Sequence, residues 1–274
     1  MGPFGKQIAV VTGGASGIGC AICRYLAVHG AHVVIADRDE RAAEKTAAAI
    51  GSAGGSAESV VLDVSESADV ETVIRRTARE HGRIDYLFNN AGVSVNGEFQ
   101  DLSPEHLRHV MNVNFWGTVF GCRSVYPIMV RQGCGHIVNT ASLAGLIPGG
   151  LTTIYSASKH AVVGLSLTLR SEAKQYGIKV SALCPGYLRT NIQQTTENVS
   201  EYMNSRRNRN MNEQMNFLTP EDCIEDIMRA IRKNRGIIVV PARHRIYWWI
   251  HRIAPDFIPS MFHRIIIRMK RQAD

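Results

Sequence analysis

The sequence predicts an α/β protein in which a doubly wound parallel sheet of about seven strands is covered by helices on both faces. Three observations lead to this prediction. Short runs rich in β-branched residues alternate with segments of helical periodicity along most of the chain. These runs are apolar throughout, which indicates strands buried on both faces. The first run leads directly into a glycine-rich loop, which is typical of a strand-to-helix turn in this class.

The predicted elements follow one another in regular alternation. The predicted strands are 8–12, 32–36, 59–63, 84–90, 136–142, 178–185 and 236–241. The predicted helices are 17–29, 39–50, 67–81, 103–132, 153–176 and 219–234. The clearest helix start is Thr219-Pro220, where a hydroxyl N-cap precedes proline and two acidic residues. We expect residues 1–241 to form one domain and residues 242–274 to form a helical extension.

The composition is that of an ordinary globular protein. Of 274 residues, 45% are hydrophobic and 20% are charged, which is enough for one large domain. The six cysteines suggest no disulfide framework, and the C-x-x-C at Cys20 and Cys23 has no second pair to support a zinc site. The ten histidines form no metal-binding pattern, so we expect no metal. The absence of a secretion signal and of a long apolar run predicts a cytoplasmic protein.

The glycine-rich loop runs from Thr12 to Gly19, between the first strand and the first helix. Glycines let the backbone approach a pyrophosphate, and the following helix directs its N-terminal amides at the negative charge. Asp37, at the end of the second strand, is placed to accept hydrogen bonds from ribose hydroxyls and to repel a 2′-phosphate. Arg38 is an alternative partner for that phosphate. NAD is therefore the preferred cofactor and NADP the alternative.

Tyr155 and Lys159 lie four residues apart at the start of a predicted helix, in the segment YSASK. This spacing puts both side chains on one helix face. A fixed ammonium near a phenol favours the phenolate, so we expect the pKa of Tyr155 to be lowered and the residue to act as an acid or base. Taken alone, the same spacing is common in helices without any chemical role.

Five motifs occur together and in order: T-G-x-x-x-G-I-G at 12–19, N-N-A-G at 89–92, Asn114, Ser142 ahead of Y-x-x-x-K, and P-G at 185–186. In this combination the chain resembles the short-chain dehydrogenase/reductase family, closely over 6–190 and more loosely to 241. The resemblance implies a Rossmann fold and hydride transfer with a nicotinamide cofactor. It implies a catalytic tetrad in which Tyr155 is the acid/base, Ser142 binds the substrate oxygen, Lys159 holds the nicotinamide ribose and Asn114 holds a relay water.

The resemblance also implies cofactor contacts and assembly. A homodimer or homotetramer is expected, with helices 103–132 and 153–176 as contact surfaces. Asn90 is expected to tie the fourth strand to its neighbour. The implied cofactor-binding residues are Gly13, Ser16, Gly17, Ile18, Gly19, Asp37, Arg38, Asp63, Val64, Asn89, Ala91, Gly92, Tyr155, Lys159, Pro185, Gly186 and Thr190.

The loop 187–218 is the expected substrate flap, and the residues expected to contact substrate are Ser94, Leu143, Ile147 and Tyr187. A wider wall of Val95, Ala144, Gly149 and Leu151 is mostly apolar. The flap adds Leu188, Ile192, Tyr202, Met203, Met211, Met215, Phe217 and Leu218. We therefore expect a small hydrophobic secondary alcohol or ketone as substrate. The alternative is a regulatory protein without turnover, which either senses nicotinamide nucleotides or associates with a membrane.

Residues 243–272 are basic and aromatic. From residue 241 onward the chain has seven Arg or Lys and two Asp, a local charge of +5 out of a total of +7. Tyr247, Trp248, Trp249, Ile250 and Ile253 in one piece, and Phe262, Ile265, Ile266 and Met269 in another, are interleaved with basic residues, as in interfacial membrane helices. Two alternatives remain open: packing on a neighbouring subunit, or covering of the substrate mouth. The nearly neutral body indicates no nucleic acid partner.

Overall fold

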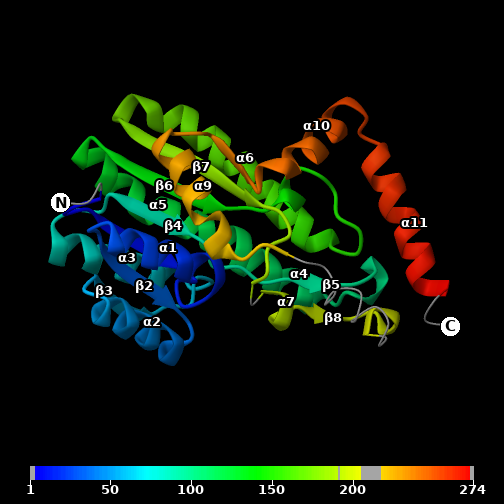
Figure 1. The fold of residues 1–274 in the computed structure, drawn as a ribbon, viewed down its shortest axis with the longest axis horizontal. Helices are drawn as coiled ribbons and strands as arrows, with labels where there is room; N and C mark the ends of the chain where they lie inside the picture. Colours follow the sequence, from blue (N-terminus) through cyan, green and yellow to red (C-terminus); the bar gives the residue numbers. More distant parts are fainter. Residues whose placement is uncertain (1–3, 191, 205–216, 272–274) are drawn as a thin grey trace.

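The structure, a computed structural model, describes residues 4–190, 192–204 and 217–271. Its centre is a seven-stranded parallel sheet with the order β3-β2-β1-β4-β6-β7-β9 (Figure 1), which confirms the predicted doubly wound α/β fold. The strands are β1 (Ile8–Thr12), β2 (His32–Asp37), β3 (Ser56–Val61), β4 (Tyr86–Asn89), β6 (Gly135–Thr140), β7 (Ile178–Pro185) and β9 (Ile237–Val240).

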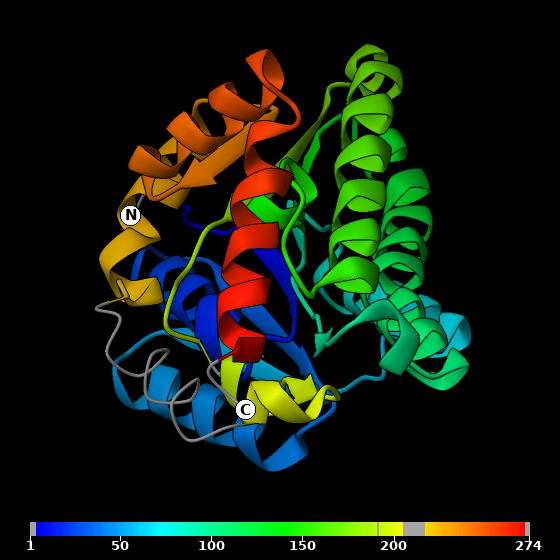
Figure 2. The ribbon, with the colours of Figure 1, turned by 90° about the vertical axis from the view of Figure 1, so that its right-hand side faces the viewer.

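Helices cover both faces of this sheet (Figure 2). The apolar side chains of each layer join those of the strands in a separate buried cluster, so both faces of the central strands are dry. One layer consists of α1 (Gly17–Val28), α2 (Glu40–Ser52) and α9 (Pro220–Arg232). The other consists of α3 (Ser67–His81), α5 (Gly117–Gln132) and α6 (Thr153–Ala173).

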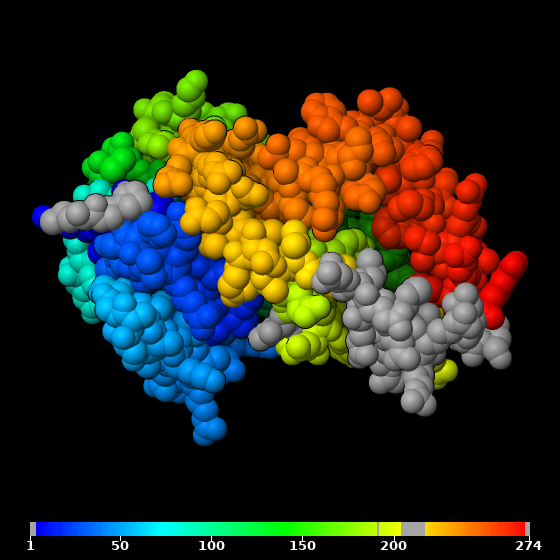
Figure 3. Space-filling model, viewed as in Figure 1, coloured from blue at the N-terminus to red at the C-terminus, as the bar shows by residue number. Residues whose placement is uncertain are grey.

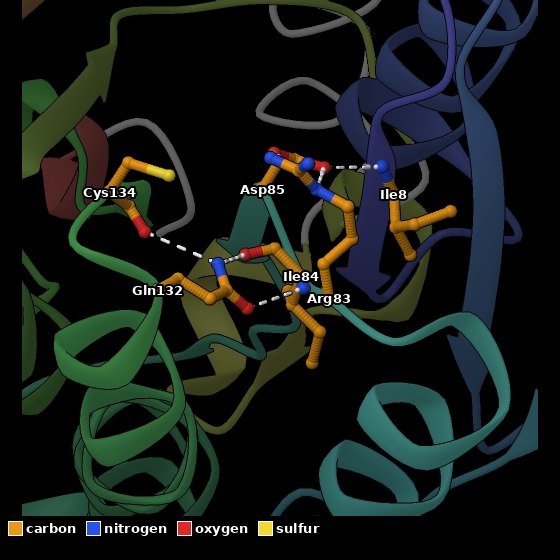
Figure 4. Close-up of polar contacts among 6 residues, drawn as sticks. All are labelled: Ile8, Arg83, Ile84, Asp85, Gln132 and Cys134. Carbon is orange, nitrogen blue, oxygen red and sulfur yellow. Dashed lines mark hydrogen bonds and ion pairs between the residues drawn. The ribbon is translucent and has the colours of Figure 1, made fainter.

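The strand order reverses between β1 and β4, and folds of this type bind their ligands beyond the carboxyl ends of the strands at such a point. The opposite, amino end of the sheet is closed by a compact set of hydrogen bonds (Figure 4). The Asp85 carboxylate accepts from the Ile8 amide at 2.9 Å and from Arg83, while the Gln132 side chain bonds both main-chain groups of Ile84. These bonds join β1, β4 and α5 at the end away from the expected site.

The predicted helix 103–132 is divided into three parts. It begins as α4 (Pro104–Met111), continues through a π-helical turn (Asn112–Trp116) and ends as α5. A π-turn inserts one residue and rotates the side chains that follow it, and such turns are frequent at functional sites. Apolar periodicity alone does not reveal it, because the segments on both sides remain helical.

The third strand begins three residues and ends two residues earlier than predicted, at Ser56–Val61 instead of 59–63. The pairing with β2 ends at Asp37 opposite Val61, and Asp63 turns away to bind the amide and hydroxyl of Ser65. The prediction followed the apolar residues 60–62. The strand lies at the edge of the sheet, where polar residues such as Glu58 are tolerated, so its first half has no apolar pattern.

The flap is held at several points. Leu188 and Leu218 form a bridge at its base, and β8 (Glu197–Asn198) pairs with β5 (Val95–Asn96) of the expected substrate wall. Ser200 also bonds the Glu98 amide and the Asp101 carboxylate. The expected substrate flap is therefore tethered in its middle. Met211 and Met215, which were expected to line it, lie outside the described residues.

The C-terminal extension forms α10 (Arg245–Ile253) and α11 (Phe257–Arg271), at one end of the molecule (Figures 1 and 3). Ile258 is buried in a cluster with Leu143 and Ile147, and Phe262 lies directly against Gly150. At its far end Lys270 forms an ion pair with Glu98. The inner side of the extension thus packs on its own chain beside the expected substrate wall. No described helix has the length and apolarity needed to cross a membrane.

We predict that the packing of α11 contributes to stability. Replacing Ile258, which is 1% exposed, with alanine should lower the free energy of unfolding by about 2–4 kcal/mol, because it leaves a cavity in a closed cluster. The matched control is Ile265→Ala on the exposed side of the same helix, where the loss should be within about 0.5 kcal/mol. Denaturant titration measures both, and equal small losses would contradict cis packing of α11.

Candidate active site

The four expected catalytic residues come from three separate segments. Asn114 lies in the π-turn, Ser142 precedes a short 3₁₀ turn after β6, and Tyr155 and Lys159 lie in the first turns of α6. Asn114 and Lys159 are buried, whereas Ser142 and Tyr155 are half-buried. The side chains of Asn114 and Lys159 therefore lie inside the protein, and the hydroxyls of Ser142 and Tyr155 lie closer to its surface.

Asn114 is held rigidly. Its carboxamide accepts from the Val93 amide at 2.8 Å and donates to the Val93 carbonyl at 2.9 Å and to the Ser158 hydroxyl at 3.0 Å. A Cβ on Gly92 would lie 3.2 Å from the Lys159 ammonium and 3.3 Å from the Asn114 side-chain oxygen. Gly92 therefore brings the N-N-A-G segment between these two residues. Ser158 was missed from the sequence, although it lies inside YSASK, immediately before Lys159.

Lys159 has its ammonium removed from water. Its Nζ donates to the Thr140 carbonyl at 2.9 Å and lies 5.7 Å from the centre of the Tyr155 ring. Burial disfavours the cation and lowers the pKa of Lys159 to about 8. The ammonium is thus positioned by a main-chain carbonyl of β6 and approaches the face of the phenol ring.

The predicted lowering of the Tyr155 pKa is wrong for the protein without cofactor. Burial disfavours the phenolate and raises the pKa of Tyr155, and the Ser142 hydroxyl, by hydrogen bonding, only partly opposes this. Lys159 does not reverse the shift, because its own charge is destabilised by the same burial. Sequence spacing placed the two residues together correctly but carried no information about their common removal from water.

The glycine-rich loop forms a cradle that side chains would fill. Gly13 has φ +62°, and a Cβ there would lie 2.8 Å from the Ala91 Cα, while a Cβ on Gly19 would lie 2.1 Å from the Gly13 carbonyl oxygen. Ser16 precedes α1 without forming a side-chain cap within the described part of the chain, so the first amides of α1 are available to an anion. This arrangement fits the pyrophosphate of a dinucleotide, with Gly17 and Ile18 as first residues of the helix.

The residues expected around the adenosine lie at the ends of β2 and β3. Asp37 accepts from the Ala15 amide of the loop at 3.0 Å and from the Asp39 amide at 3.1 Å, which fixes its carboxylate beside the loop. Arg38 is exposed. Hydrogen bonds from Ser65 hold the pKa of Asp63 below its ordinary value, while the neighbouring Val64 is buried against Gly117.

Asn89 and Asn90 have structural positions. The Asn89 side chain is buried under α5, where it donates to Asn139 at 2.9 Å, so a nucleotide contact from this residue would have to come from its main chain. Asn90 donates to the Gly13 carbonyl at 3.1 Å and accepts from the Thr140 hydroxyl at 3.2 Å, as expected for a residue that ties β4 to its neighbours. The Thr12 hydroxyl, missed from the sequence, accepts from the Asn90 and Ala91 amides.

The segment after β7 returns to the cradle. Thr190 lies against Gly17, because a Cβ there would be 3.4 Å from the Thr190 Cβ. Pro185 is the last residue of β7. Gly186 lies so close to His244 that a Cβ on Gly186 would overlap the imidazole ring of His244. His244 therefore borders the expected nicotinamide side, and burial lowers its pKa. No sequence signal identified it, since it lies beyond the region of resemblance.

The expected substrate wall is brought together beside the reactive hydroxyls. Leu143 and Ile147 directly follow Ser142 and belong to the same buried cluster as Ile258. Val95 is buried, Ser94 is half-buried and bonds Asn96, and the exposed Tyr187 ring stacks on Phe217 at 5.8 Å. Gly149 and Leu151 lie in the loop that enters α6, with Ala144 in the turn after Ser142.

Two histidines that appeared unrelated in the sequence meet at the amino end of β2. His32 and His81 lie 3.6 and 3.1 Å from one oxygen of Glu58, and these three are the described residues whose geometry approaches a metal site. The Arg76 guanidinium lies 3.6 Å from the other carboxylate oxygen. A guanidinium this close to Glu58 would repel a metal ion, so we interpret the three residues as part of an ion-pair cluster. This cluster lies far from the expected catalytic residues in the fold. His160 is exposed and bonds the Ser156 carbonyl of its own helix.

Comparison with known proteins agrees with this architecture. The family model described as short chain dehydrogenase matches residues 7–200. "Probable oxidoreductase EphD" of Mycobacterium tuberculosis is 35% identical over 266 residues, which cover 94% of this chain and 45% of that protein. The chain thus spans about half the length of this relative.

Solved structures show the same fold in proteins with bound nucleotides. A short-chain dehydrogenase/reductase from Burkholderia phymatum in complex with NAD has 31% identity and a TM-score of 0.83, over 93% of this chain and 96% of that chain. A Beutenbergia cavernae structure described as "a putative NAD(P) dependent gluconate 5-dehydrogenase", with NADP at low occupancy, has 33% identity and a TM-score of 0.76 over 87% and 97% of the two chains. With the matched model and this sheet topology, the chain belongs to the short-chain dehydrogenase family of oxidoreductases.

Proposed function

We propose that the protein interconverts a hydrophobic secondary alcohol and its ketone with NAD as cofactor. The observation that carries this proposal is the juxtaposition of the Ser142 and Tyr155 hydroxyls with the apolar cluster of Leu143 and Ile147. The glycine cradle, which side chains would fill, supports a dinucleotide on the adjoining side. Bound there, a nicotinamide supplies hydride transfer to or from the reacting carbon.

The chain's own residues supply the proton chemistry. Tyr155, the acid/base in this proposal, donates its phenolic proton to the ketone oxygen and takes a proton back from the alcohol in the reverse direction. Ser142 donates a hydrogen bond to the same oxygen and stabilises its developing charge. Lys159, positioned by the Thr140 carbonyl, holds the ribose hydroxyls and stabilises the phenolate. Asn114, fixed by Val93 and Ser158, orients the water that returns the proton.

The preference for NAD rests on Asp37. Its carboxylate is fixed by amides of Ala15 and Asp39 beside the loop, where the ribose of a dinucleotide lies in this fold. A carboxylate there accepts from ribose hydroxyls and repels a 2′-phosphate. Arg38 is exposed and free to move toward such a phosphate, and family neighbours are known with either nucleotide. Asp37 is the stronger determinant because its position is already fixed.

The preference for an apolar substrate rests on three segments. The wall contributes Leu143 and Ile147, α11 contributes Phe262 at Gly150, and the flap contributes the stacked rings of Tyr187 and Phe217. Burying each additional methylene of a substrate against such surfaces contributes about 0.8 kcal/mol. Polyols would lose hydrogen bonds to water without enough polar partners here.

We also propose a homodimer or homotetramer. Outer side chains of the expected contact helices support it: Trp116, Leu167 and Tyr176 are large and exposed along the π-turn, α6 and the turn that follows. Large apolar side chains on the outside of one helical layer are suited to burial against a second subunit. The subunit contact would thus use the face of α5 and α6 away from the sheet.

An activity panel tests the proposed reaction. With NAD, apolar secondary alcohols should give kcat/KM values at least about tenfold above those of polyols, because each buried methylene adds to binding. With NADP the values should be lower because Asp37 opposes the additional phosphate. Reduced-nicotinamide absorbance is the readout. Faster turnover of polyols would overturn the substrate class, and activity with NADP alone would overturn the cofactor choice.

Tyr155→Phe distinguishes an enzyme from a nucleotide sensor. The variant keeps the ring beside Lys159 and should bind NAD as the wild type does, but its kcat should fall by at least about 10²-fold because the proton donor is lost. Tyr86→Phe, at the start of β4 and so at the end of the sheet away from the site, is the matched control and should leave both quantities unchanged. Fluorescence titration gives binding, and absorbance gives kcat. Full activity in Tyr155→Phe would contradict the proposed acid/base.

The charge state of Lys159 predicts a pH-dependent stability. Its folded pKa of about 8 lies below the ordinary 10.5, so the unfolded chain binds more protons between these values and stability rises with pH across this window. Lys159→Met should therefore be more stable than the wild type near neutral pH, by up to about 3 kcal/mol, and the difference should shrink above about pH 8.

Denaturant titrations of the two cofactor-free proteins from about pH 7 to about pH 10 measure this difference. Lys179→Met, at an exposed position of β7, is the control and should show no such trend. A difference that stays constant across the range would mean that Lys159 does not titrate in this window.

A further inference from the structure

We propose that the corner formed by α10 and α11 docks on an anionic lipid bilayer. The two helices meet at a short turn at one end of the molecule (Figure 1), and Ile253 and Phe257 flank this turn. Ile253 is 82% exposed, and Phe257 is also exposed. Two large apolar side chains at a protruding turn are costly to leave in water and are suited to insertion between lipid headgroups.

The helix α10 has apolar side chains on two sides. Trp248 and Ile250 pack on the cluster beneath the helix. Ile246, Trp249 and Ile253, spaced at i, i+3 and i+7, share another face, and all three are exposed. Core packing therefore explains the first pair but not the second set. The second face is an outward apolar stripe that continues to Phe257.

The extension that carries this stripe is strongly basic. The described extension has seven Arg or Lys against one acidic residue, Asp256. Of these seven, Lys270 alone lies within ion-pair distance of a described carboxylate. The Arg252 guanidinium lies 5.7 and 5.6 Å from the ring centres of Trp248 and Trp249, so its charge is next to the apolar stripe. This combination of unpaired cations and exposed aromatic residues is complementary to an anionic headgroup layer.

One side of α11 carries a shallow hollow beside the turn. Its volume is ≈ 250 Å³, and Phe257, Met261 and Ile265 form its apolar lining. Arg264 and Arg268, one helical turn apart, stand on its rim. An apolar hollow with two guanidinium groups at its edge fits one lipid, with acyl carbons in the hollow and the phosphate on the arginines.

A second copy of the chain is a poorer occupant. In a two-fold symmetric interface the same patch faces itself, so Arg252, Arg264 and Arg268 of one copy would approach those of the other. Such like charges would repel in the absence of acidic partners, and Asp256 is the described carboxylate within the patch. An anionic bilayer meets all of these cations with opposite charge.

Docking at this corner would also influence substrate entry, a consequence that rests on the proposed function. The inner side of α11 borders the substrate wall through Phe262 and Gly150, and its far end contacts the loop at Glu98. A bilayer on the outer side of the same helix would bring a membrane-dissolved alcohol or ketone close to the mouth of the site. Vesicle binding itself does not depend on this reaction.

Co-sedimentation with vesicles tests the docking surface. The full chain should bind phosphatidylglycerol/phosphatidylcholine vesicles at low salt, bind phosphatidylcholine vesicles at least about tenfold more weakly, and dissociate as salt is raised. Trp249→Ala/Ile253→Ala/Phe257→Ala should reduce the partition coefficient by at least about tenfold. Arg264→Gln/Arg268→Gln should reduce it by roughly tenfold on anionic vesicles alone.

Two control variants carry matched changes elsewhere. Val28→Ala/Val61→Ala/Phe99→Ala removes exposed apolar groups from other surfaces, and Arg41→Gln/Arg79→Gln removes exposed charges, so neither should affect partitioning. No binding by the wild type, or equal losses in control and corner variants, would overturn the proposal. The proposal would also be overturned if light scattering showed that the corner variants change the number of subunits while their binding to vesicles is unaffected. NAD turnover of a water-soluble alcohol, measured without vesicles, tests the proposed function separately.

Discussion

The hydrogen bonds of Asn90 connect the nucleotide end of the protein to its catalytic end. The side chain donates to the carbonyl of Gly13 in the glycine-rich loop and accepts from the hydroxyl of Thr140, whose carbonyl in turn receives the ammonium of Lys159. The amide of Asn90 is fixed by Thr12. One side chain thus sets the distance between β1, β4 and β6 at their carboxyl ends, where a dinucleotide and a substrate must meet.

The anchoring of Lys159 has a cost that affects the proposed reaction. A buried ammonium that donates to a neutral main-chain carbonyl is poorly stabilised, and both the lowered pKa of Lys159 and the raised pKa of Tyr155 have burial as their main cause. Burial thus opposes both the phenolate of Tyr155 and the ammonium of Lys159. Ribose hydroxyls and the cofactor's charge would complete the environment, which would couple nucleotide binding to activation of Tyr155.

The C-terminal extension shows how one helix pair can serve two surfaces. Ile258 and Phe262 complete the cluster beside the substrate wall, so the extension is part of the folded body. The opposite face keeps its large apolar and basic side chains outside. Successive side chains of an α-helix are rotated by about 100° around its axis. One helix can therefore direct some apolar side chains into the core and present other apolar and basic side chains to the outside.

The sequence by itself determined the strand and helix alternation, the glycine cradle and the Tyr155–Lys159 pair, because these depend on local periodicity and on spacing within one turn or one helix. Only the tertiary structure decided the direction of the Tyr155 pKa shift, the π-turn at Asn114, the tethering of the flap at Ser200 and the approach of His244 to Gly186. Each of these depends on burial or on contacts between residues far apart in the chain. Such contacts leave no periodic pattern in the sequence, and burial is a property of the complete packing.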